Sequence, residues 1–337
     1  MRGPVRWGVL GCAAIAEKVF NGAVQASQTG ELHAVASRDV ERARQWQERF
    51  GFRKAYGSYE ALLQDPEVEA VYIPLPNALH REWTLAAVQA GKHVLCEKPA
   101  GLTAAEVEAM VAGARQAGVL FAENFAFRFH PQSVRLRELL DQGAIGQVLG
   151  LEASFTFRME ERSGDIRLAP ALGGGAAYDL GCYPIAFARF VFGREPRSVL
   201  AFGDLHPQFQ VEMTSAGVLD FGEGRTAAFF TSFEVPGGQR ARILGTEGEI
   251  LLPAPYHPRR EDHVIILRRY RPGRSEPEEE RIATPVVEPF TAAVDNLGRA
   301  IRGQEAPLLP AEDAIAQARV LDAVLQSARD GARVWLG

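Results

Sequence analysis

The stretch VRWGVLGCAAIA, residues 5–16, decides the fold, because it joins an apolar strand to a glycine turn and the start of a helix. VRWGVL (5–10) predicts a buried strand, and GCAAIA (11–16) matches G-x-G-x-x-G loosely. Gly11 is placed for the tight turn, while Ala13 and Ala16 stand where the second and third glycines would be. In such a unit, backbone N–H groups at the helix N-terminus approach a pyrophosphate, and alanine permits this if its φ stays negative. The motif therefore indicates a dinucleotide-binding unit.

Strands and helices alternate through the rest of the first third of the chain. Further strands are expected at 31–37, 68–75, 93–97 and 119–123. Helices are expected between the strands, at 14–27, 40–51 and 79–91, with one more that begins at Thr103. Alternation of this kind implies right-handed βαβ units, hence a doubly wound parallel sheet of the Rossmann type.

The pattern changes after about residue 124. Period-two alternation predicts a large, mostly antiparallel sheet, with strands at 150–157, 197–203, 211–221, 225–235, 240–252 and 263–270. Helices are expected at 130–143 and 310–331, and the polar stretch 271–281 is interpreted as a surface loop. The predicted fold is α/β, with a Rossmann domain at 1–124 and an α/β domain at 125–337 for substrate binding and oligomerisation.

Composition excludes several classes of protein. The 337 residues are too many for one ordinary core, and a net charge of −5 argues against a nucleic-acid binder. No run of 18 apolar residues predicts a membrane span, and the N-terminal residues do not resemble a signal peptide. The three cysteines form no C-x-x-C pair, so we expect a reduced cytoplasmic protein without a metal site.

The end of the second expected strand bears on the choice of cofactor. Ser37, Arg38 and Asp39 follow it, where the adenine ribose of a dinucleotide would lie. A hydroxyl and a guanidinium suit a ribose 2′-phosphate, so NADP is favoured. Asp39 keeps NAD open, because an acid at this point can accept the ribose 2′-hydroxyl.

A second stretch, GGGAAYDLGCYP (173–184), carries candidate acid–base chemistry. If 176–183 is helical, Asp179 and Tyr183 lie four residues apart on one face. Taken alone, Tyr183 is better interpreted as a core aromatic residue. Tyr178 points about 100° away on such a helix and is assigned to packing.

Four segments in order resemble one family, that of glucose–fructose oxidoreductase and inositol dehydrogenase (Gfo/Idh/MocA). They are IPLPNALH (73–80), CEKP (96–99), AENFAFRFHP (122–131) and GGGAAYDLGCYP (173–184). The resemblance extends over nearly the whole chain and is strongest to the branch of D-xylose dehydrogenases and dihydrodiol dehydrogenases. It implies a cytoplasmic NAD(P)-dependent enzyme that oxidises a sugar, diol or cyclic alcohol, or reduces the carbonyl form.

The resemblance also implies roles for individual residues. Lys98 matches the catalytic lysine, with Glu97 either holding the cofactor ribose or orienting the lysine, and the Lys98–Pro99 bond is expected to be cis. Tyr183 stands where many members have a histidine acid–base, and Asp179 would orient a substrate hydroxyl. Because a phenol titrates near 10 and an imidazole near 6.5, Tyr183 would need help from Lys98 to act as a base.

The remaining candidates would hold the cofactor. They are Gly11, Cys12, Ala13, Ile15, Ala16, Ser37, Arg38, Pro74, Leu75, Asn77, His80, Glu97, Lys98, Asn124 and Arg128. For His80, capping or packing of the next helix is an equal alternative, and His130 is left open between a structural and a site role.

The resemblance leaves the substrate and the assembly less defined. It implies a homodimer or homotetramer formed through the C-terminal sheet, and a specificity region around 156–170, where Arg158, Arg162, Asp165 and Arg167 face either ligand or water. Two rival hypotheses remain: a dinucleotide-sensing regulatory protein without turnover, and a glycosidase that uses NAD transiently.

Overall fold

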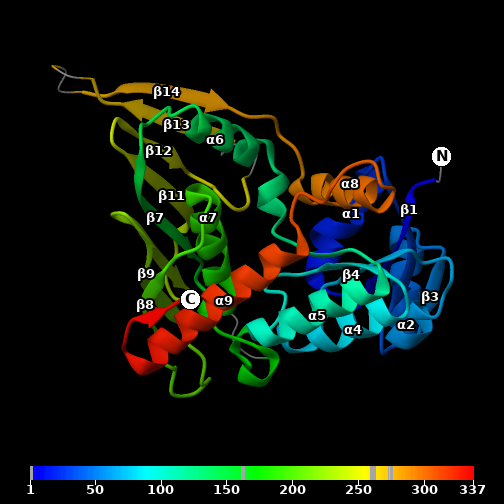
Figure 1. Cartoon of the computed structure of the whole chain (residues 1–337). Coiled ribbons are helices and arrows are strands. Elements are labelled where there is room, and N and C mark those ends of the chain that lie inside the picture. The colour runs from blue at the N-terminus through cyan, green and yellow to red at the C-terminus, as the bar shows by residue number, and fades with distance from the viewer. Residues whose placement is uncertain (1–2, 161–163, 259–262, 272, 274–275) are drawn as a thin grey trace. The chain divides into compact units, whose positions relative to one another are not determined.

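Strand–helix alternation in the first third of the chain produces a six-stranded parallel sheet in the order β3-β2-β1-β4-β5-β6 (Figure 1). Its strands are β1 (Val5–Leu10), β2 (Gly30–Ala36), β3 (Lys54–Tyr56), β4 (Ala70–Ile73), β5 (His93–Cys96) and β6 (Phe121–Glu123). In this computed structural model, all residues are described except 1–2, 161–163, 259–262, 272 and 274–275. The predicted Rossmann sheet is confirmed, and β3 is a short edge strand that sequence reasoning missed.

Helices lie around this sheet, and several of them begin or end at a capping residue. They are α1 (Asn21–Ala26), α2 (Val40–Phe50), α3 (Tyr59–Leu63), α4 (His80–Gln89), α5 (Ala104–Ala117) and α8 (Pro289–Ile301). The Thr103 hydroxyl accepts from the N–H of Glu106 at the start of α5, and Gly51 ends α2 in the left-handed region. The helix expected at 14–27 is observed over 14–26, and it contains a π-helical segment, η1 (Ala16–Phe20), ahead of α1.

The chain divides into two units of contacting residues. The first unit comprises Met1–Phe129 and Glu288–Ala318, and the second comprises His130–Val287 and Arg319–Gly337. Residues 288–318, expected in the C-terminal domain, therefore belong to the first unit. Asp295 of α8 shows why: its Oδ1 accepts hydrogen bonds from the Ser27 hydroxyl (2.5 Å) and the Thr29 hydroxyl (3.0 Å) ahead of β2.

The second unit is built on a nine-stranded sheet in the order β14-β13-β12-β11-β7-β10-β9-β8-β15 (Figure 1). Its strands are β7 (Val148–Thr156), β8 (Ser198–Phe202), β9 (Thr214–Gly222), β10 (Arg225–Ser232), β11 (Gly238–Gly245), β12 (Gly248–Leu252), β13 (Val264–Arg269), β14 (Glu278–Ala283) and β15 (Val334–Trp335). Neighbours are antiparallel except β7 and β10, so the predicted mostly antiparallel sheet is confirmed.

One face of this sheet carries helices and the other is open. The helices of the unit are α6 (Pro131–Asp141), α7 (Cys182–Phe192) and the later part of α9 (Ala311–Asp330). Helix α7 packs on β7 and β10, and α6 packs on β13. Along β10, Ala227 and Phe229 are buried while Ala228 and Phe230 are exposed, as the two-residue period of a half-covered strand requires.

The interpretation of 271–281 as a loop is wrong for its last residues. Glu278–Ala283 forms β14, an edge strand paired with β13. Its glutamates face arginines across the pair, with Arg268 Nε 2.9 Å from Glu279 Oε2 and Arg269 Nη1 3.0 Å from Glu280 Oε2. Cross-strand charge pairs, not apolar burial, hold this edge, so the alternation that marks an ordinary strand is missing from the sequence.

Two further expectations concern the chain as a whole. In the described part of the chain, no helix is long and apolar enough to cross a membrane. Cys12, Cys96 and Cys182 are all free and buried.

Candidate active site

The turn after β1 has the geometry that its glycine predicts. Gly11 lies at φ +100°, and a Cβ there would come 2.8 Å from Leu75 Cδ2, so this position requires glycine. Its N–H donates to the Ala36 carbonyl at 2.9 Å, which ties the turn to the end of β2. Cys12 and Ala16 are buried here, while Ala13 and Ile15 are half-buried.

At the end of β2, the acid next to Arg38 is engaged in capping a helix. Asp39 Oδ1 accepts from the N–H groups of Glu41 (3.0 Å) and Arg42 (3.3 Å) and so caps α2. The Ser37 hydroxyl accepts from the Asp39 N–H at 3.1 Å, and Arg38 is exposed. The turn after β2 thus combines a hydroxyl and a guanidinium with a carboxylate held by the helix.

Arg42 is a residue that sequence reasoning missed at this turn. Its Nη2 donates to the Cys12 carbonyl at 2.7 Å, so its guanidinium lies against the turn after β1. The available signal was its position, because a residue three after a helix cap lies in the first turn, beside the cap.

Glu97 and Lys98 end β5 in a fixed geometry. Glu97 Oε1 accepts from the Tyr72 hydroxyl (2.6 Å) and from Asn124 Nδ2 (2.7 Å), and its Oε2 accepts from the Lys98 N–H (3.3 Å). Burial raises the pKa of Glu97, and these hydrogen bonds oppose the rise. The Lys98–Pro99 peptide is cis, as expected, and the Lys98 side chain is half-buried. Glu97 therefore contacts the backbone of Lys98.

His80 connects two of the predicted cofactor loops. It is fully buried at the first turn of α4, with Nδ1 2.9 Å from the Pro99 carbonyl oxygen and Nε2 2.8 Å from that of Leu75. Burial lowers its pKa, so the ring is neutral and donates to one of the two carbonyls. Pro74 and Leu75 follow β4 directly, and Asn77 begins the short 3₁₀ helix η2 (Asn77–Leu79).

Asn124 and Arg128 follow β6. Asn124 is buried, its N–H donates to the Cys96 carbonyl at 2.8 Å, and among the described residues its Oδ1 has no hydrogen-bond partner. Arg128 is half-buried in the 3₁₀ helix η3 (Ala126–Phe129). The structure thus places the first unit's candidates on the turns after β1, β2, β4, β5 and β6, at the carboxyl ends of parallel strands, where ligands of this fold bind.

Asp179 and Tyr183 lie in the second unit. The helix predicted at 176–183 is a π-helical turn, η6 (Ala177–Gly181), that runs into α7. Pro184 has no N–H to donate within the helix, and a π turn is a common way to absorb such an irregularity. Tyr183 is 8 % exposed and belongs to the buried first turn of α7.

The triple glycine ahead of this turn has a packing explanation. Gly175 lies at φ +116°, and a Cβ there would come 2.4 Å from Glu212 Oε1. The same carboxylate accepts the Ala177 N–H at 2.8 Å, at the start of η6. Burial raises the pKa of Glu212, with this hydrogen bond opposing the rise. Glycine is thus needed to let the chain pass a buried carboxylate that caps η6.

Asp179 is paired with an arginine from the predicted specificity region. Arg167 Nε donates to Asp179 Oδ2 at 2.8 Å, and its Nη1 lies 3.3 Å from Asp165 Oδ2. The Arg167 guanidinium also lies over the Phe157 ring, 5.9 Å from its centroid. This arrangement leaves a partly exposed Asp–Arg–Asp group beside η6. Of the other two arginines expected in this region, Arg158 is exposed and Arg162 lies outside the described residues.

The Tyr183 hydroxyl has a histidine neighbour that sequence reasoning missed. His257 Nε2 is 3.1 Å from Tyr183 Oη. Phe155 and Tyr256 pack against the tyrosine ring, with centroids 5.3 Å and 5.4 Å away. His257 is separated from Tyr183 by 74 residues. His257 follows β12 and lies outside the four segments that resemble the family. The sequence therefore offers no reason to place it beside Tyr183.

The sequence as a whole matches known protein families. Residues 5–125 match the oxidoreductase family with an NAD-binding Rossmann fold, and residues 133–251 match the GFO/IDH/MocA C-terminal domain. The chain belongs to the GFO/IDH/MocA family. It is 36 % identical to a D-xylose 1-dehydrogenase (NADP(+)) of Haloferax volcanii, over 98 % of this chain and 99 % of that protein.

Two other GFO/IDH/MocA relatives are a diol dehydrogenase and a ketoreductase. A trans-1,2-dihydrobenzene-1,2-diol dehydrogenase of Xenopus tropicalis is 35 % identical over 74 % of this chain and 75 % of its own. The crystal structure of a 3-ketoreductase from Actinomadura kijaniata, in complex with NADP and TDP-benzene, superposes with a TM-score of 0.89. That enzyme is 34 % identical, over 96 % of this chain and 98 % of its own. This GFO/IDH/MocA chain is therefore an oxidoreductase with a dinucleotide-binding domain, and the predicted family and branch are confirmed.

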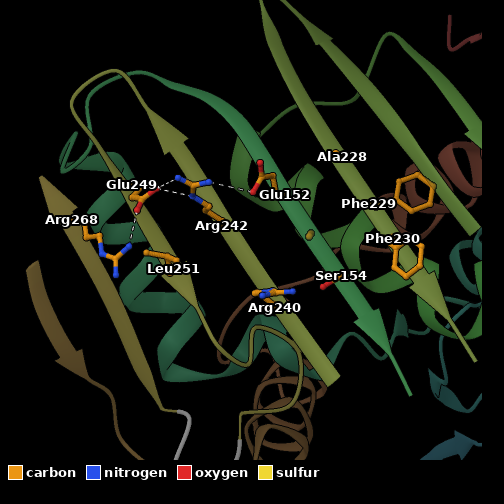
Figure 2. A pocket seen from close by; sticks show the side chains of 11 residues that line it. Glu152, Ser154, Ala228, Phe229, Phe230, Arg240, Arg242, Glu249, Leu251 and Arg268 are labelled. Carbon is orange, nitrogen blue, oxygen red and sulfur yellow. Dashed lines mark hydrogen bonds and ion pairs between the residues drawn. The ribbon is translucent and has the colours of Figure 1, made fainter. Parts of the chain in front are cut away.

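The open face of the second unit's sheet carries a second group of charges in this GFO/IDH/MocA chain (Figure 2). Glu249 is 3 % exposed and accepts from Arg242 Nε (2.7 Å) and Arg268 Nη1 (3.1 Å). Glu152 and Arg240 extend this charged strip, and Phe230 lies beside it on β10 (Figure 2).

One group of side chains in the described residues has a spacing suited to a metal ion. His33, Asp65 and Glu67 bring their ligand atoms within 4.8 Å of one another. Lys54 Nζ lies 3.0 Å from Asp65 Oδ2 and also bonds Glu67, so an ammonium already pairs with both carboxylates. We therefore assign this group to the packing of the sheet edge.

Proposed function

We propose that this protein is an NADP-preferring oxidoreductase that acts on an aldose or a related polyhydroxylated or cyclic alcohol, or on its carbonyl form. The observation that carries the proposal is the Tyr183 hydroxyl, held at 3.1 Å from an imidazole and one helical turn from Asp179. A phenol so placed can exchange a proton with a substrate oxygen. The sugar substrate class is supported by the D-xylose dehydrogenase and the 3-ketoreductase among the relatives.

The first unit fits a nicotinamide dinucleotide. A glycine turn opens the first helix, a hydroxyl and two guanidinium groups gather at the end of β2, and a lysine stands at the end of β5. When bound, the dinucleotide supplies hydride-transfer chemistry. We assign the phosphates to the turn at 11–16, and the nicotinamide end to the loops that carry Leu75 and Lys98.

The preference for NADP rests on the turn after β2. The Asp39 carboxylate is held by the α2 N-terminus, whereas Ser37 and the exposed Arg38 are positioned to bind a 2′-phosphate. Arg42 adds a second guanidinium beside Cys12. Arginine donors in a fork match phosphate oxygens, and two cations favour the dianion over a ribose hydroxyl.

Three side chains would act on the substrate. Tyr183 takes the hydroxyl proton in oxidation and returns it in reduction, and the Lys98 ammonium assists by hydrogen-bonding the reacting oxygen. Asp179 accepts a second substrate hydroxyl, while Arg167 fixes the carboxylate at 2.8 Å and orients it. Stabilisation of charge on the reacting oxygen acts mainly in the transition state, so loss of these groups should lower kcat more than it raises KM.

The test is NADPH formation over a panel of aldoses, polyols and trans-diols, followed by absorbance, with NADPH oxidation on dicarbonyls as the reverse assay. We expect Tyr183→Phe and Lys98→Met each to lower kcat by roughly a hundred-fold or more, as loss of an acid–base group does. Tyr178→Phe is the matched control, since it removes a neighbouring phenol from the same turn.

Wild-type turnover in Tyr183→Phe would contradict the mechanism. Tight NADP binding by the wild-type protein, without turnover of any compound in the panel, would instead support a dinucleotide-sensing role.

For the assembly, we propose a homo-oligomer, a dimer or tetramer formed through the open sheet face. Phe202, Val218 and Phe230 are 61 %, 44 % and 39 % exposed on neighbouring strands, next to the strip of paired arginines and glutamates. Nine strands spaced ~4.8 Å apart make a face roughly 40 Å wide, which is enough for a standard interface of about 800 Å² per partner. A face with both charges and apolar groups can pair with its own copy.

A further inference from the structure

The backbone at His257 is held by hydrogen bonds from one side chain, that of Gln239. The side-chain amide of Gln239, on β11, makes three hydrogen bonds to the backbone of the 256–257 segment. Its Oε1 accepts from the N–H groups of Tyr256 and His257, both at 2.7 Å, and its Nε2 donates to the His257 carbonyl at 3.0 Å. This set fixes the amide orientation as well as the segment.

With its backbone held in this way, the imidazole of His257 contacts the Tyr183 hydroxyl. Nε2 lies 3.1 Å from the phenol oxygen, and the two rings meet edge to face, with centroids 5.1 Å apart and planes inclined by 71°. Phe155 packs against both rings, at 5.3 Å from Tyr183 and 5.8 Å from His257. Because aromatic packing restrains both partners, the hydrogen bond is maintained without an ordering cost in each turnover.

The two partners differ in exposure. Tyr183 is 8 % exposed, whereas His257 is half-buried. His257 therefore has Nε2 at the phenol and is itself partly accessible to solvent. Imidazole is the side chain that accepts and releases protons near neutral pH, while a phenol alone titrates near 10.

We propose that His257 is the positioning and proton-relay residue for Tyr183, an inference that rests on the proposed function. In alcohol oxidation, the phenol proton moves to Nε2, the phenolate then takes the substrate hydroxyl proton, and the imidazolium gives one proton to water. Proton exchange with water then returns the imidazole to the tautomer that carries its proton on Nδ1, so that Nε2 can accept again. A bound oxidised dinucleotide would accept the hydride with the electron pair of the C–H bond and would leave in its reduced form, so one proton would be released for each alcohol oxidised. Reduction runs the same transfers in reverse.

The relay divides the proton transfer between the two side chains. The imidazole supplies the proton exchange near neutral pH, and the phenol supplies the contact with the substrate oxygen. Gln239 then contributes to catalysis only through the position of His257.

The experiment compares His257→Gln and His257→Ala with the wild-type protein, using a substrate that the panel identifies. Glutamine can still hydrogen-bond the phenol but cannot carry its proton. We expect both variants to lower kcat at neutral pH by at least about ten-fold with little change in KM, a smaller loss than the ~10²–10⁴ of a direct acid–base group. In both variants kcat should rise with pH, because hydroxide then removes the Tyr183 proton in place of the imidazole.

Exogenous imidazole provides a second readout that a structural role would not move. It should restore much of the kcat of His257→Ala, because the deletion leaves room beside the phenol, and it should not restore Tyr183→Phe. His206→Ala is the control, a half-buried histidine of the same unit whose ring stacks on Phe209 at 4.7 Å. Thermal unfolding of each variant checks that the fold is kept.

The outcomes separate the two proposals. Absence of turnover by the wild-type protein, or wild-type kcat in Tyr183→Phe, would overturn the proposed function. An active wild-type protein would overturn the relay if its His257 variants keep the kcat and pH profile, or if their loss is not rescued by imidazole and does not depend on pH.

Discussion

Arg38 and Arg42 provide positive charge at the end of β2, and their effect can be measured with the two dinucleotides. We expect Arg38→Ala to lower kcat/KM for NADP by about ten-fold or more, as loss of one charge-assisted hydrogen bond of ~1.5–3 kcal/mol implies. NAD carries no 2′-phosphate, so its kcat/KM should change little. Steady-state kinetics with both dinucleotides measure the difference.

Arg44→Ala is the control for this comparison. Arg44 is exposed on α2, the helix that follows Arg38, and forms a surface ion pair with Glu41 at 2.5 Å. An equal loss with NAD and NADP in Arg38→Ala, or a higher wild-type kcat/KM with NAD, would contradict the assignment of Arg38.

At this scale the sequence predicted residues that follow a strand directly and missed those brought in from elsewhere. Gly11 could be anticipated from the turn that follows its strand, and the cis Lys98–Pro99 peptide from the resemblance of CEKP (96–99) to the family. Arg42 was missed although its place three residues after the Asp39 cap was a signal, whereas His257 could not be anticipated, since its position depends on the pairing of β11 with β12. Long-range register is not encoded in local periodicity.

Among the elements, α6 begins with a histidine that makes its stability depend on pH. His130 Nδ1 accepts the Gln132 N–H at 3.0 Å, so the ring caps the helix and must be neutral to do so. Burial, with His263 as the second cause, lowers the pKa of His130 to about 4. His130 is therefore structural, which answers the question that its sequence position left open.

The sign of the pH effect follows from the two states. The unfolded histidine titrates near 6.5 and the folded one near 4, so between these values the unfolded state binds more protons. The stability from this residue is complete above pH 6.5 and is lost as the pH falls, by about 3 kcal/mol down to pH 4. His130→Asn keeps a capping oxygen and removes the titration, so the free energy of unfolding should fall less steeply with acid in this variant.

Urea unfolding at a series of pH values measures the slope. His206→Asn is the control, because His206 Nδ1 also accepts a backbone N–H, that of Gln208 at 3.2 Å, outside any helix. Identical slopes for the wild-type protein and His130→Asn would contradict the role given to His130.

Elements were predicted well where apolar residues repeat and poorly where charges hold the structure. The helices from Val40 and Ala104 follow their caps, and β1 and β5 follow their apolar runs. Strand β14 was missed because its residues bond to β13 through ion pairs. The π turn at Ala177–Gly181 was also missed, since its cause is the conjunction of Gly175, Glu212 and Pro184.

At the scale of the whole chain, the sequence predicted two sheets of the correct kinds but not the path of residues 288–318. That segment joins the first unit through Asp295 and through Arg302, whose guanidinium lies 2.9 Å from Glu69 Oε1. The sequence of this segment does not show which unit it joins. Any amphipathic helix has an apolar face to bury, and that face could pack on either unit.

The proposed assembly through the open sheet face gives the last prediction. Phe230 is exposed at the middle of that face, on β10, so Phe230→Glu would place an unpaired charge in the interface (Figure 2). Burying such a charge costs several kcal/mol per copy, and a two-fold axis doubles the cost. We expect the wild-type protein to sediment as a dimer or tetramer, and the variant to dissociate toward monomer with each unit still folded. Val134→Glu is the control, since Val134 is 50 % exposed on α6, a helix that packs on β13. A monomeric wild-type protein, or an oligomer unchanged by Phe230→Glu, would show that the open face is not the interface.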